Sequence, residues 1–360
     1  MINFRYHVVS IVAVFLALAI GIVLGSTELQ GTAIDVLQKT SNQVKSEYDN
    51  AHAQDVLLQQ QVNGAEAFAQ ADEARLLDGL LDGQRVVLVT APGAPGTVVS
   101  GMMSALRQAG ATVTGQVSLQ PKLLDASANN QQFLSSLVQT LVQSGSGLSN
   151  GTPLQQAAEL LGSAILTKDN PAGGTTDPAG NQSGDTGKQS SNGQEVLASY
   201  AQAGLLSISG QPSVPATLAM VITPSTPPAG GDSDPANQSL ITLAQGLNMA
   251  GLGTVMAGSI SGSVSGSAID ALRGSTAAGQ ISSVDDADMV SGQIVTVQAL
   301  ALALTGHKAG SYGVGPGNNG AAPSPAPTPS ASVTPTTTTG SQGKSTKTSA
   351  SGKKPSKGKA

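Results

Sequence analysis

The sequence predicts an α/β fold with a mainly parallel sheet, carried on an N-terminal transmembrane helix and a helical stalk. Three observations predict it. An uncharged apolar run lies near the N-terminus, a long stretch without proline follows it, and from Arg85 onward short apolar runs alternate with helical segments. Because consecutive parallel strands need a crossover to return the chain, this alternation is typical of a parallel sheet covered on both faces.

The apolar run at 8–25 is interpreted as a transmembrane signal anchor. Between Val8 and Leu24 it carries no charge, and at about 1.5 Å per residue it extends over roughly 25 Å, close to the thickness of a hydrocarbon core. A signal peptide cleaved after Gly25 is the alternative. Arg5 precedes the run and acidic residues follow it, so the positive-inside tendency places the stub 1–7 in the cytoplasm and the bulk outside.

The segment 28–82 is expected to form a helical stalk. A spacing of three and four residues holds for ten positions, most of them apolar, small or aromatic: Leu37, Ser41, Val44, Tyr48, Ala51, Asp55, Leu58, Val62, Ala65 and Ala69. Such spacing is typical of a coiled coil and predicts a homodimer through the stalk. An amphipathic helix lying on its own α/β domain is the alternative.

The α/β domain is expected at 84–312. Val86–Thr90 is an apolar run bounded by turn residues, as in a buried strand, and the turn at Pro92–Gly96 leads into a helix. By the same signals, strands are predicted at Val86–Thr90, Thr112–Leu119, Leu205–Ser209, Ala216–Thr223, Gly253–Ala257 and Ile281–Val284. Helices are predicted at Val98–Gln108, Gln131–Gln143, Pro153–Leu166, Glu195–Ala203, Pro235–Ala250, Ala268–Arg273 and Gly292–Leu304.

Two segments have the composition of flexible chain. The stretch 168–192 is rich in Pro, Gly, Asn, Ser and Asp and is predicted to be a flexible insertion. The segment 313–360 is rich in Pro, Ser and Thr, ends in lysines, and is predicted to be a disordered tail. Six lysines lie in this tail, which leaves the rest with 11 basic and 22 acidic residues. The acidic body argues against nucleic-acid binding, whereas the tail suits an anionic wall polymer.

The chemistry of the sequence excludes several kinds of site. The chain has no cysteine, so disulfides and thiolate metal sites are excluded. The Pro92–Gly96 loop follows a strand but lacks the glycine pattern of a dinucleotide site and the lysine of a phosphate loop. No pairing of a nucleophile with a base is evident, and we expect no enzymatic activity.

Motifs at both ends of the chain resemble those of a known family. Arg5, His7 and Phe15–Ser26 at the start, and Ser283–Asp288, Gly292–Leu300, Gly306-His307 and Tyr312-Gly313 near the end, resemble the actinobacterial copper transporter MctB family. The resemblance covers about 1–315 apart from 168–192, and the tail beyond Gly315 departs from it. It implies a cell-envelope protein associated with copper export or tolerance. It also implies a link to cell-wall remodelling through a cytoplasmic partner.

Copper is expected only through this resemblance, because no copper site is visible in the sequence. Thioether and thiolate ligands select Cu(I), and imidazole suits Cu(II). The histidines are His7, His52 and His307, and the methionines form no closely spaced repeat. His7 and His52 are interpreted as an interfacial and a solvated helix residue.

The densest polar cluster is the candidate ligand site. Asp285, Asp286 and Asp288 follow a predicted strand, and His307 comes one helix later. Carboxylates at the end of a strand in an open α/β sheet lie where ligands usually bind, and they suit a hard cation or a substrate amine. Alternatively, Asp286 or Asp288 caps the helix that begins near Gly292.

The predicted function is that of an envelope membrane protein in copper transport and homeostasis. It is expected to be single-pass, in the cell membrane or an outer envelope, and to have no self-contained pore because one helix cannot enclose a channel. The alternative is a non-catalytic dimeric scaffold that regulates cell-wall remodelling enzymes. The expected partners are the membrane, a second copy, a cytoplasmic membrane partner and cell-wall enzymes.

Overall fold

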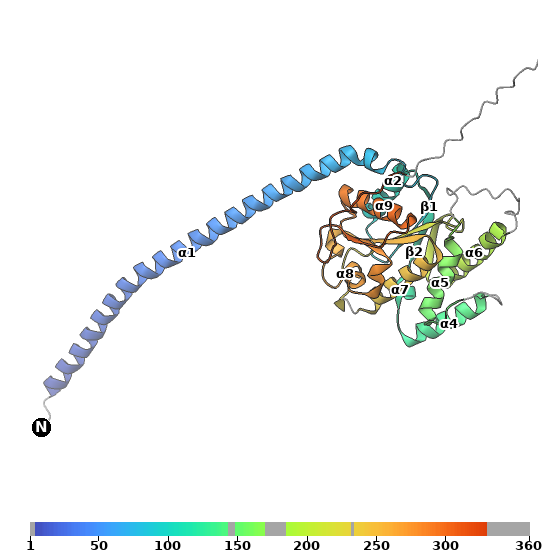
Figure 1. Cartoon of the computed structure of the whole chain (residues 1–360). Helices are drawn as coiled ribbons and strands as arrows, with labels where there is room; N and C mark the ends of the chain where they lie inside the picture. The colour runs from blue at the N-terminus through green and yellow to red at the C-terminus, as the bar shows by residue number, and fades with distance from the viewer. Residues whose placement is uncertain (1–3, 143–147, 170–184, 232–233, 330–360) are drawn as a thin grey trace, which may run out of the picture.

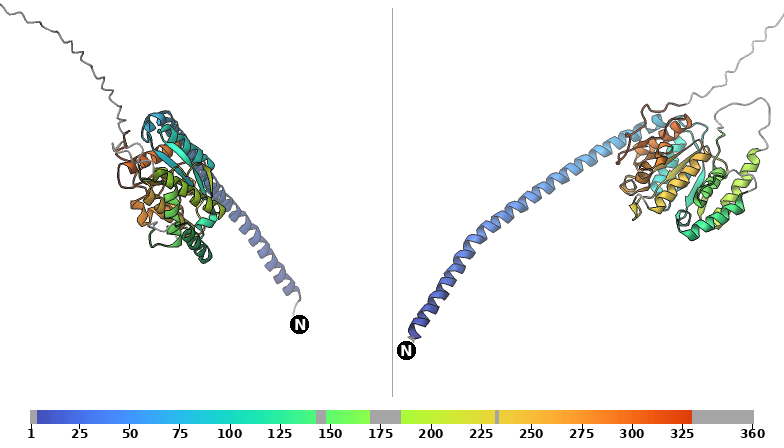
Figure 2. Two further views of the ribbon diagram at one scale, coloured as in Figure 1. Left: turned by 90° about the vertical axis from the view of Figure 1, so that its right-hand side faces the viewer. Right: turned by 60° about the horizontal axis from the view of Figure 1, so that its bottom comes forward.

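The computed structural model describes residues 4–142, 148–169, 185–231 and 234–329. A long helix, α1 (Phe4–Leu77), leads into an α/β domain (Figure 1). At about 1.5 Å per residue, α1 is roughly 110 Å long. Its N-terminal part projects away from the domain, and its last turns lie against α2 and α9 (Figures 1 and 2). The predicted anchor and stalk are therefore one continuous helix.

Helix α1 ends earlier than the stalk predicted at 28–82. It stops at Leu77 because Gly79 and Gly83 adopt positive φ angles of 70° and 72°, which no right-handed helix contains. Within the described residues, Phe4–Gly25 is the one helix long and apolar enough to cross a membrane, and none of it is buried. The pairing of two stalks in a coiled coil stays a prediction.

One sheet organises the domain. Within the described residues its strand order is β3-β2-β1-β4-β5-β6-β7, and all neighbours pair parallel except β2 with β3. This confirms the predicted, mainly parallel sheet. The strands are β1 (Arg85–Thr90), β2 (Thr112–Leu119), β3 (Leu206–Gly210), β4 (Leu218–Ile222), β5 (Gly253–Ala257), β6 (Ser282–Val284) and β7 (Ser311–Tyr312).

Helices cover both faces of the sheet and bury two apolar clusters. Alternate β1 residues point to opposite faces: Val86 and Leu88 join the cluster under α1, α2 and α9, whereas Val87 and Val89 join the cluster under the other helices. The first cover consists of the end of α1, α2 (Gly96–Gln108) and α9 (Val290–Leu304). The second consists of α3 (Pro121–Leu124), α4 (Ala128–Leu141), α5 (Pro153–Ile165), α6 (Asp185–Gln202), α7 (Pro235–Ala250) and α8 (Ala268–Arg273).

The two segments predicted to be flexible differ from expectation where the structure describes them. Of the predicted insertion 168–192, residues 170–184 lie outside the described residues, and α6 already begins at Asp185. Of the predicted tail 313–360, residues 330–360 lie outside the described residues. The part from Gly313 to Pro329 was wrongly predicted to be disordered: it follows β7, and hydrogen bonds of Val314, Gly315 and Asn319 attach its first residues to the domain.

Candidate functional site

Asp285, the first of the predicted ligand residues, is committed to a structural ion pair. It follows β6, and its Oδ2 lies 2.7 Å from Nη1 of Arg273 in α8; the two side chains are 0% and 5% exposed. Its Oδ1 also accepts the backbone N–H of Val314 at 2.8 Å and of Gly315 at 3.0 Å. Both oxygens of Asp285 are therefore used to hold the chain that follows β7.

Arg273 completes this attachment from the other side. Besides Asp285, its guanidinium donates to Ser283 Oγ at 3.1 Å and to the carbonyl oxygens of Pro316 and Tyr312 at 2.7 and 2.8 Å. The planar fork of an arginine suits such divergent acceptors. Together Arg273 and Asp285 join α8, β6 and the segment after β7, which is the physical reason that this segment is ordered.

Asp286 is buried in a different way. It is 4% exposed, and its Oδ1 has no hydrogen-bond partner within the described structure. Burial raises the pKa of Asp286 to about 6, with smaller contributions from the negative charges of Asp285, Asp288 and Glu66. Asp286 therefore gains a proton in a pH range where an ordinary aspartate stays ionised.

The remaining predicted residues lie apart from this pair. Asp288 is exposed, and its Oδ1 accepts the backbone N–H of Ile260 at 3.0 Å, at the start of the short helix η2 (Ile260–Gly262). His307 is exposed, and its Nδ1 lies 2.5 Å from Thr305 Oγ1. Across the described ranges, no group of three or more His, Cys, Asp or Glu side chains could hold a metal ion. A ligand role for the four residues stays a prediction.

The predicted cap of α9 was wrong. Its N-cap residue is Met289, which has no side-chain cap, and neither Asp286 nor Asp288 bonds the free N–H groups of the first turn. Glu66 of α1 does so instead, accepting the backbone N–H of Val290 at 2.6 Å and the hydroxyl of Ser291 at 2.5 Å. Glu66 could not be singled out from sequence, because it is one acidic residue among several on a long helix.

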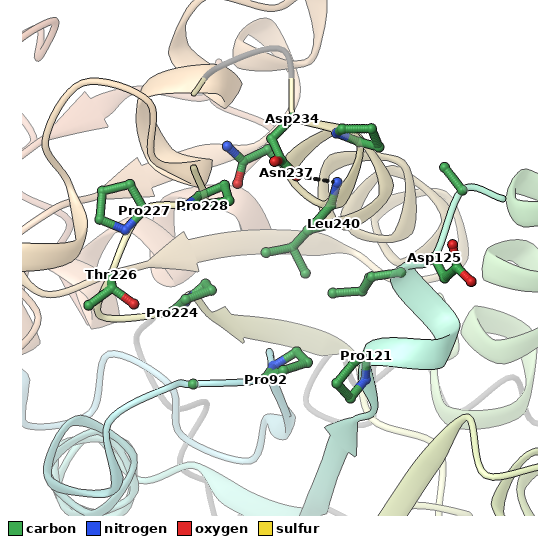
Figure 3. A pocket seen from close by; sticks show the side chains of 15 residues that line it. Pro92, Pro121, Asp125, Pro224, Thr226, Pro227, Pro228, Asp234, Asn237 and Leu240 are labelled. Carbon is green, nitrogen blue, oxygen red and sulfur yellow. Dashed lines mark hydrogen bonds between the residues drawn. The ribbon is translucent and has the colours of Figure 1, made fainter. Parts of the chain in front are cut away.

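The structure adds a cavity that sequence analysis did not identify. From β1 the chain passes to β2 on one side, and from β4 to β5 on the other, so β1 and β4 flank a topological switch point. Ligands of open α/β sheets bind outside the carboxyl ends of the strands at such a point. A cavity of about 490 Å³ lies there, lined by Pro92, Gly93, Pro121, Leu124, Asp125, Ala126, Pro224, Thr226, Pro227, Pro228, Asp234, Pro235, Ala236, Asn237 and Leu240 (Figure 3).

The polar residues of this switch-point pocket are held in place by backbone groups. Asp234 is the N-cap of α7 and accepts the N–H groups of Ala236 at 2.8 Å and Gly230 at 3.2 Å. Asn237 donates to the carbonyl oxygens of Gly231 and Gly266. The pocket is therefore preformed, which is the usual state of small-molecule sites.

Asp125, which follows α3 and lines the pocket, is fixed by its neighbour Ser127. The backbone N–H and the hydroxyl of Ser127 each donate to it at 2.9 Å, and these bonds lower the pKa of Asp125. A carboxylate that accepts such bonds stays ionised at neutral pH. The pocket therefore has a permanent negative charge at Asp125.

A second cavity, of about 610 Å³, lies on the other side of the loop after β1. Its polar side is a network in which Thr90 donates to Ser118 at 3.0 Å and Gln116 donates to both hydroxyls. Met103 and Arg107 of α2 also line it, with the guanidinium 3.8 Å from the sulfur. The two cavities share Pro92, Gly93 and Pro121.

Comparison with known proteins agrees with the resemblance at both ends of the chain. The family model described as "Copper transport outer membrane protein, MctB" matches residues 1–323, so the match extends beyond Gly315, where we expected it to end. The protein named "Copper transporter MctB" of Mycobacterium tuberculosis is 31% identical over 326 residues, covering 88% of this chain and 98% of that protein. Its namesake of Mycobacterium leprae is 32% identical over 328 residues, with the same coverage. This chain is a membrane protein that belongs to the MctB family of copper transport proteins.

Proposed function

We propose that this protein serves copper homeostasis as an α/β domain tethered to the membrane by α1, and that further subunits supply the path for the ion. Its family and its relatives named as copper transporters support copper as the cargo. The observation that carries the tether is the continuity of α1, which runs unbroken from the apolar segment Phe4–Gly25 to the contact of Glu66 with α9. A channel must be enclosed on every side, which one helix cannot do.

The length of α1 supports a spacing role. From Gly25 to Glu66 the helix rises by roughly 60 Å, which holds the domain well clear of a membrane that contains Phe4–Gly25. With Arg5 before the span and acidic residues after it, the domain lies outside the cytoplasm in this proposal.

An anchor exchange tests the tether. In a strain that lacks the protein, residues 4–25 of the reintroduced chain are replaced by an unrelated single-pass anchor of equal length. Cell-associated copper is then measured by elemental analysis during growth in copper. Full restoration of the wild-type copper content is expected, because a tether needs only length and hydrophobicity. Loss of restoration at equal protein level would show that side chains of Phe4–Gly25 take part in the ion path.

Two controls make the exchange interpretable. The intact chain must itself lower the copper content of the deletion strain; if it does not, copper as the cargo is refuted. The domain exported without any anchor should restore little, since tethering is what the proposal assigns to α1.

A second candidate function, a non-catalytic dimeric scaffold for cell-wall remodelling enzymes, is favoured by the exposed seam of α1. The predicted seam residues Leu37, Val44, Tyr48, Leu58 and Val62 are 47% to 69% exposed in the chain. Apolar side chains repeated at heptad spacing stabilise paired helices when a second copy covers them. The same pairing would also bring two apolar spans together in one assembly.

A charge placed on the seam tests this pairing. Leu58→Lys is expected to convert a dimeric full-length chain into a monomer in detergent, measured by sedimentation equilibrium. Gln60→Lys is the matched control, because Gln60 is exposed two residues further along the same helix and outside the seam. A wild-type monomer, or dimers in both variants, would exclude the stalk as the dimer contact.

A further inference from the structure

We propose that the switch-point pocket binds a small molecule that joins an apolar body to a positively charged amine. The proposal concerns the cavity at the carboxyl ends of β1 and β4 and is independent of copper. Its volume of about 490 Å³ lies within the usual range for small-molecule sites, roughly 300 to 1,000 Å³.

The walls of the pocket supply the apolar part of the site. Six proline rings line it, together with Leu124 and Leu240. Figure 3 shows Pro92 and Pro121 on the side of the pocket opposite Asp234, with Leu240 between them. Proline rings have little conformational freedom to lose, so an apolar body docks against them without ordering long side chains.

Two carboxylates supply the charge preference. Asp125 and Asp234 both line the pocket, and the described residues of its lining include no Lys, Arg or His. Lys122 follows the lining residue Pro121 in the sequence, but its side chain contacts other residues. Its Nζ donates to the Ala203 carbonyl and lies over the ring of Phe133. Asp125 is exposed to solvent and Asp234 is half-buried, so an amine bound in the pocket meets two carboxylates that have no basic partner among the described lining residues.

The carboxylates keep acceptor capacity for this amine. Each of the two accepts two hydrogen bonds from the protein, one at each oxygen. A carboxylate has about four acceptor positions, so each can receive an ammonium donor as well. A calcium ion takes about six to eight oxygen ligands. Besides the two carboxylates, the side chains of Thr226 and Asn237 carry the oxygens of this lining, and the prolines and leucines that make up most of the remainder offer none from their side chains. An amine on an apolar body fits both halves of the pocket.

Tryptamine is a suitable probe because the chain contains no tryptophan. Indole fluorescence, excited beyond the tyrosine band, then reports on the ligand alone. The full-length chain in detergent is titrated with tryptamine, with the neutral tryptophol and with the anionic indole-3-acetate, each against protein-free micelles. Tryptamine is expected to bind saturably and at least about tenfold tighter than tryptophol, the usual effect of a charged hydrogen bond. Equal affinities, tighter binding of the acetate or no saturable binding would overturn the proposal.

Variants locate the binding. The double variant Asp125→Asn, Asp234→Asn removes both charges, while each asparagine can still accept one hydrogen bond at its amide oxygen. It is expected to abolish the preference for tryptamine, so that tryptamine and tryptophol bind with about equal affinity. Ala126→Phe adds a ring at an exposed lining position and is expected to weaken both ligands.

A charge-matched control distinguishes binding in the pocket from general electrostatic attraction of tryptamine to the acidic protein. Glu47→Gln with Asp49→Asn removes two exposed carboxylates of α1, far from the pocket. This control is expected to bind tryptamine like the wild type. If the control loses as much affinity as the pocket double variant, or if the pocket double variant loses none, the pocket is not the site.

Discussion

The carboxylate of Glu66 accepts the backbone N–H of Val290 at 2.6 Å across 224 residues of sequence, so the stalk helix caps the helix α9 of the α/β domain. The same carboxylate also bonds the Ser291 hydroxyl. An unpaired helix N-terminus attracts negative charge, and α9 has no cap of its own. The end of α1 is therefore attached to the domain through a specific polar contact as well as through apolar packing.

Removal of this cap should destabilise the domain and loosen the end of α1. Glu66→Ala is expected to lower the free energy of unfolding by about 1 to 2 kcal/mol, the usual cost of a lost N-cap. Chemical denaturation measures the loss, and hydrogen exchange at Val290 should become faster. Glu47→Ala on the exposed part of α1 is the control and should change neither quantity. Equal effects in both variants would refute the cap.

The buried carboxyl of Asp286 should make stability depend on pH. Its pKa is raised from 3.8 to about 6 in the folded chain, so the folded state holds the proton more tightly than the unfolded state. The stabilisation from this proton is complete below about pH 4 and is lost as the pH rises through about 6. At neutral pH the ionised form costs up to about 3 kcal/mol.

Asp286→Asn isolates this contribution from the other titrating groups. The difference in free energy of unfolding between variant and wild type should shift in favour of the variant as the pH rises from 4 to 8. Urea denaturation at each pH measures the difference. Glu47→Gln, on the exposed part of α1 and away from Asp286, serves as control and should show a flat difference. A flat difference for Asp286→Asn as well would mean that Asp286 titrates normally.

The ion pair of Arg273 and Asp285 predicts a larger loss. Asp285→Asn leaves the buried guanidinium without its charge partner and weakens the bonds to Val314, at a cost of about 3 kcal/mol or more. Limited proteolysis should then cut near Val314. Asp72→Asn breaks the exposed pair with Arg75 and should cost less than about 1 kcal/mol.

The outcome also decides between two roles of Asp285. If Asp285 is structural, its substitution lowers the stability and the function of the protein together. If Asp285 is a ligand residue, its substitution impairs copper handling while the free energy of unfolding stays nearly constant. Copper content of cells that produce each variant, set beside the denaturation curves, distinguishes them.

The fold was largely predictable because each buried strand is a short apolar run between breakers. Gly253–Ala257 and Thr112–Leu119 have the bounds expected from sequence, as does the helix Pro235–Ala250. Short elements such as α3 and β7 were missed, since four and two residues carry no periodicity. Their position depends on neighbours that are distant in the chain.

The sites were less predictable because they join distant segments. Nothing local to Glu66 marks it as the cap of a helix 224 residues later. The chain after Tyr312 is rich in Gly, Asn and Pro, which indicates disorder, yet Asp285 and Arg273 hold it in place. Pro92 was predicted only as part of the turn Pro92–Gly96, and Pro224 was not singled out. The signal that could have found the pocket is that both follow strands whose ends meet at one edge.

Helices α5 and α7 pack so closely that a methyl group between them should be costly. A Cβ added at Gly246 of α7 would lie 2.7 Å from the backbone and Cβ of Ala158 in α5. Gly246→Ala must push the two helices apart and is expected to lower the free energy of unfolding by about 1 to 3 kcal/mol.

A second glycine in a helix gives the matched control for this packing. Gly64 of α1 has nothing within 4 Å of an added Cβ, so Gly64→Ala should raise the helix stability by about 0.5 to 1 kcal/mol through the higher helix propensity of alanine. Denaturation curves of the two variants should therefore shift in opposite directions. A gain in both would mean that α5 and α7 separate at little cost, and that the glycine serves no packing role.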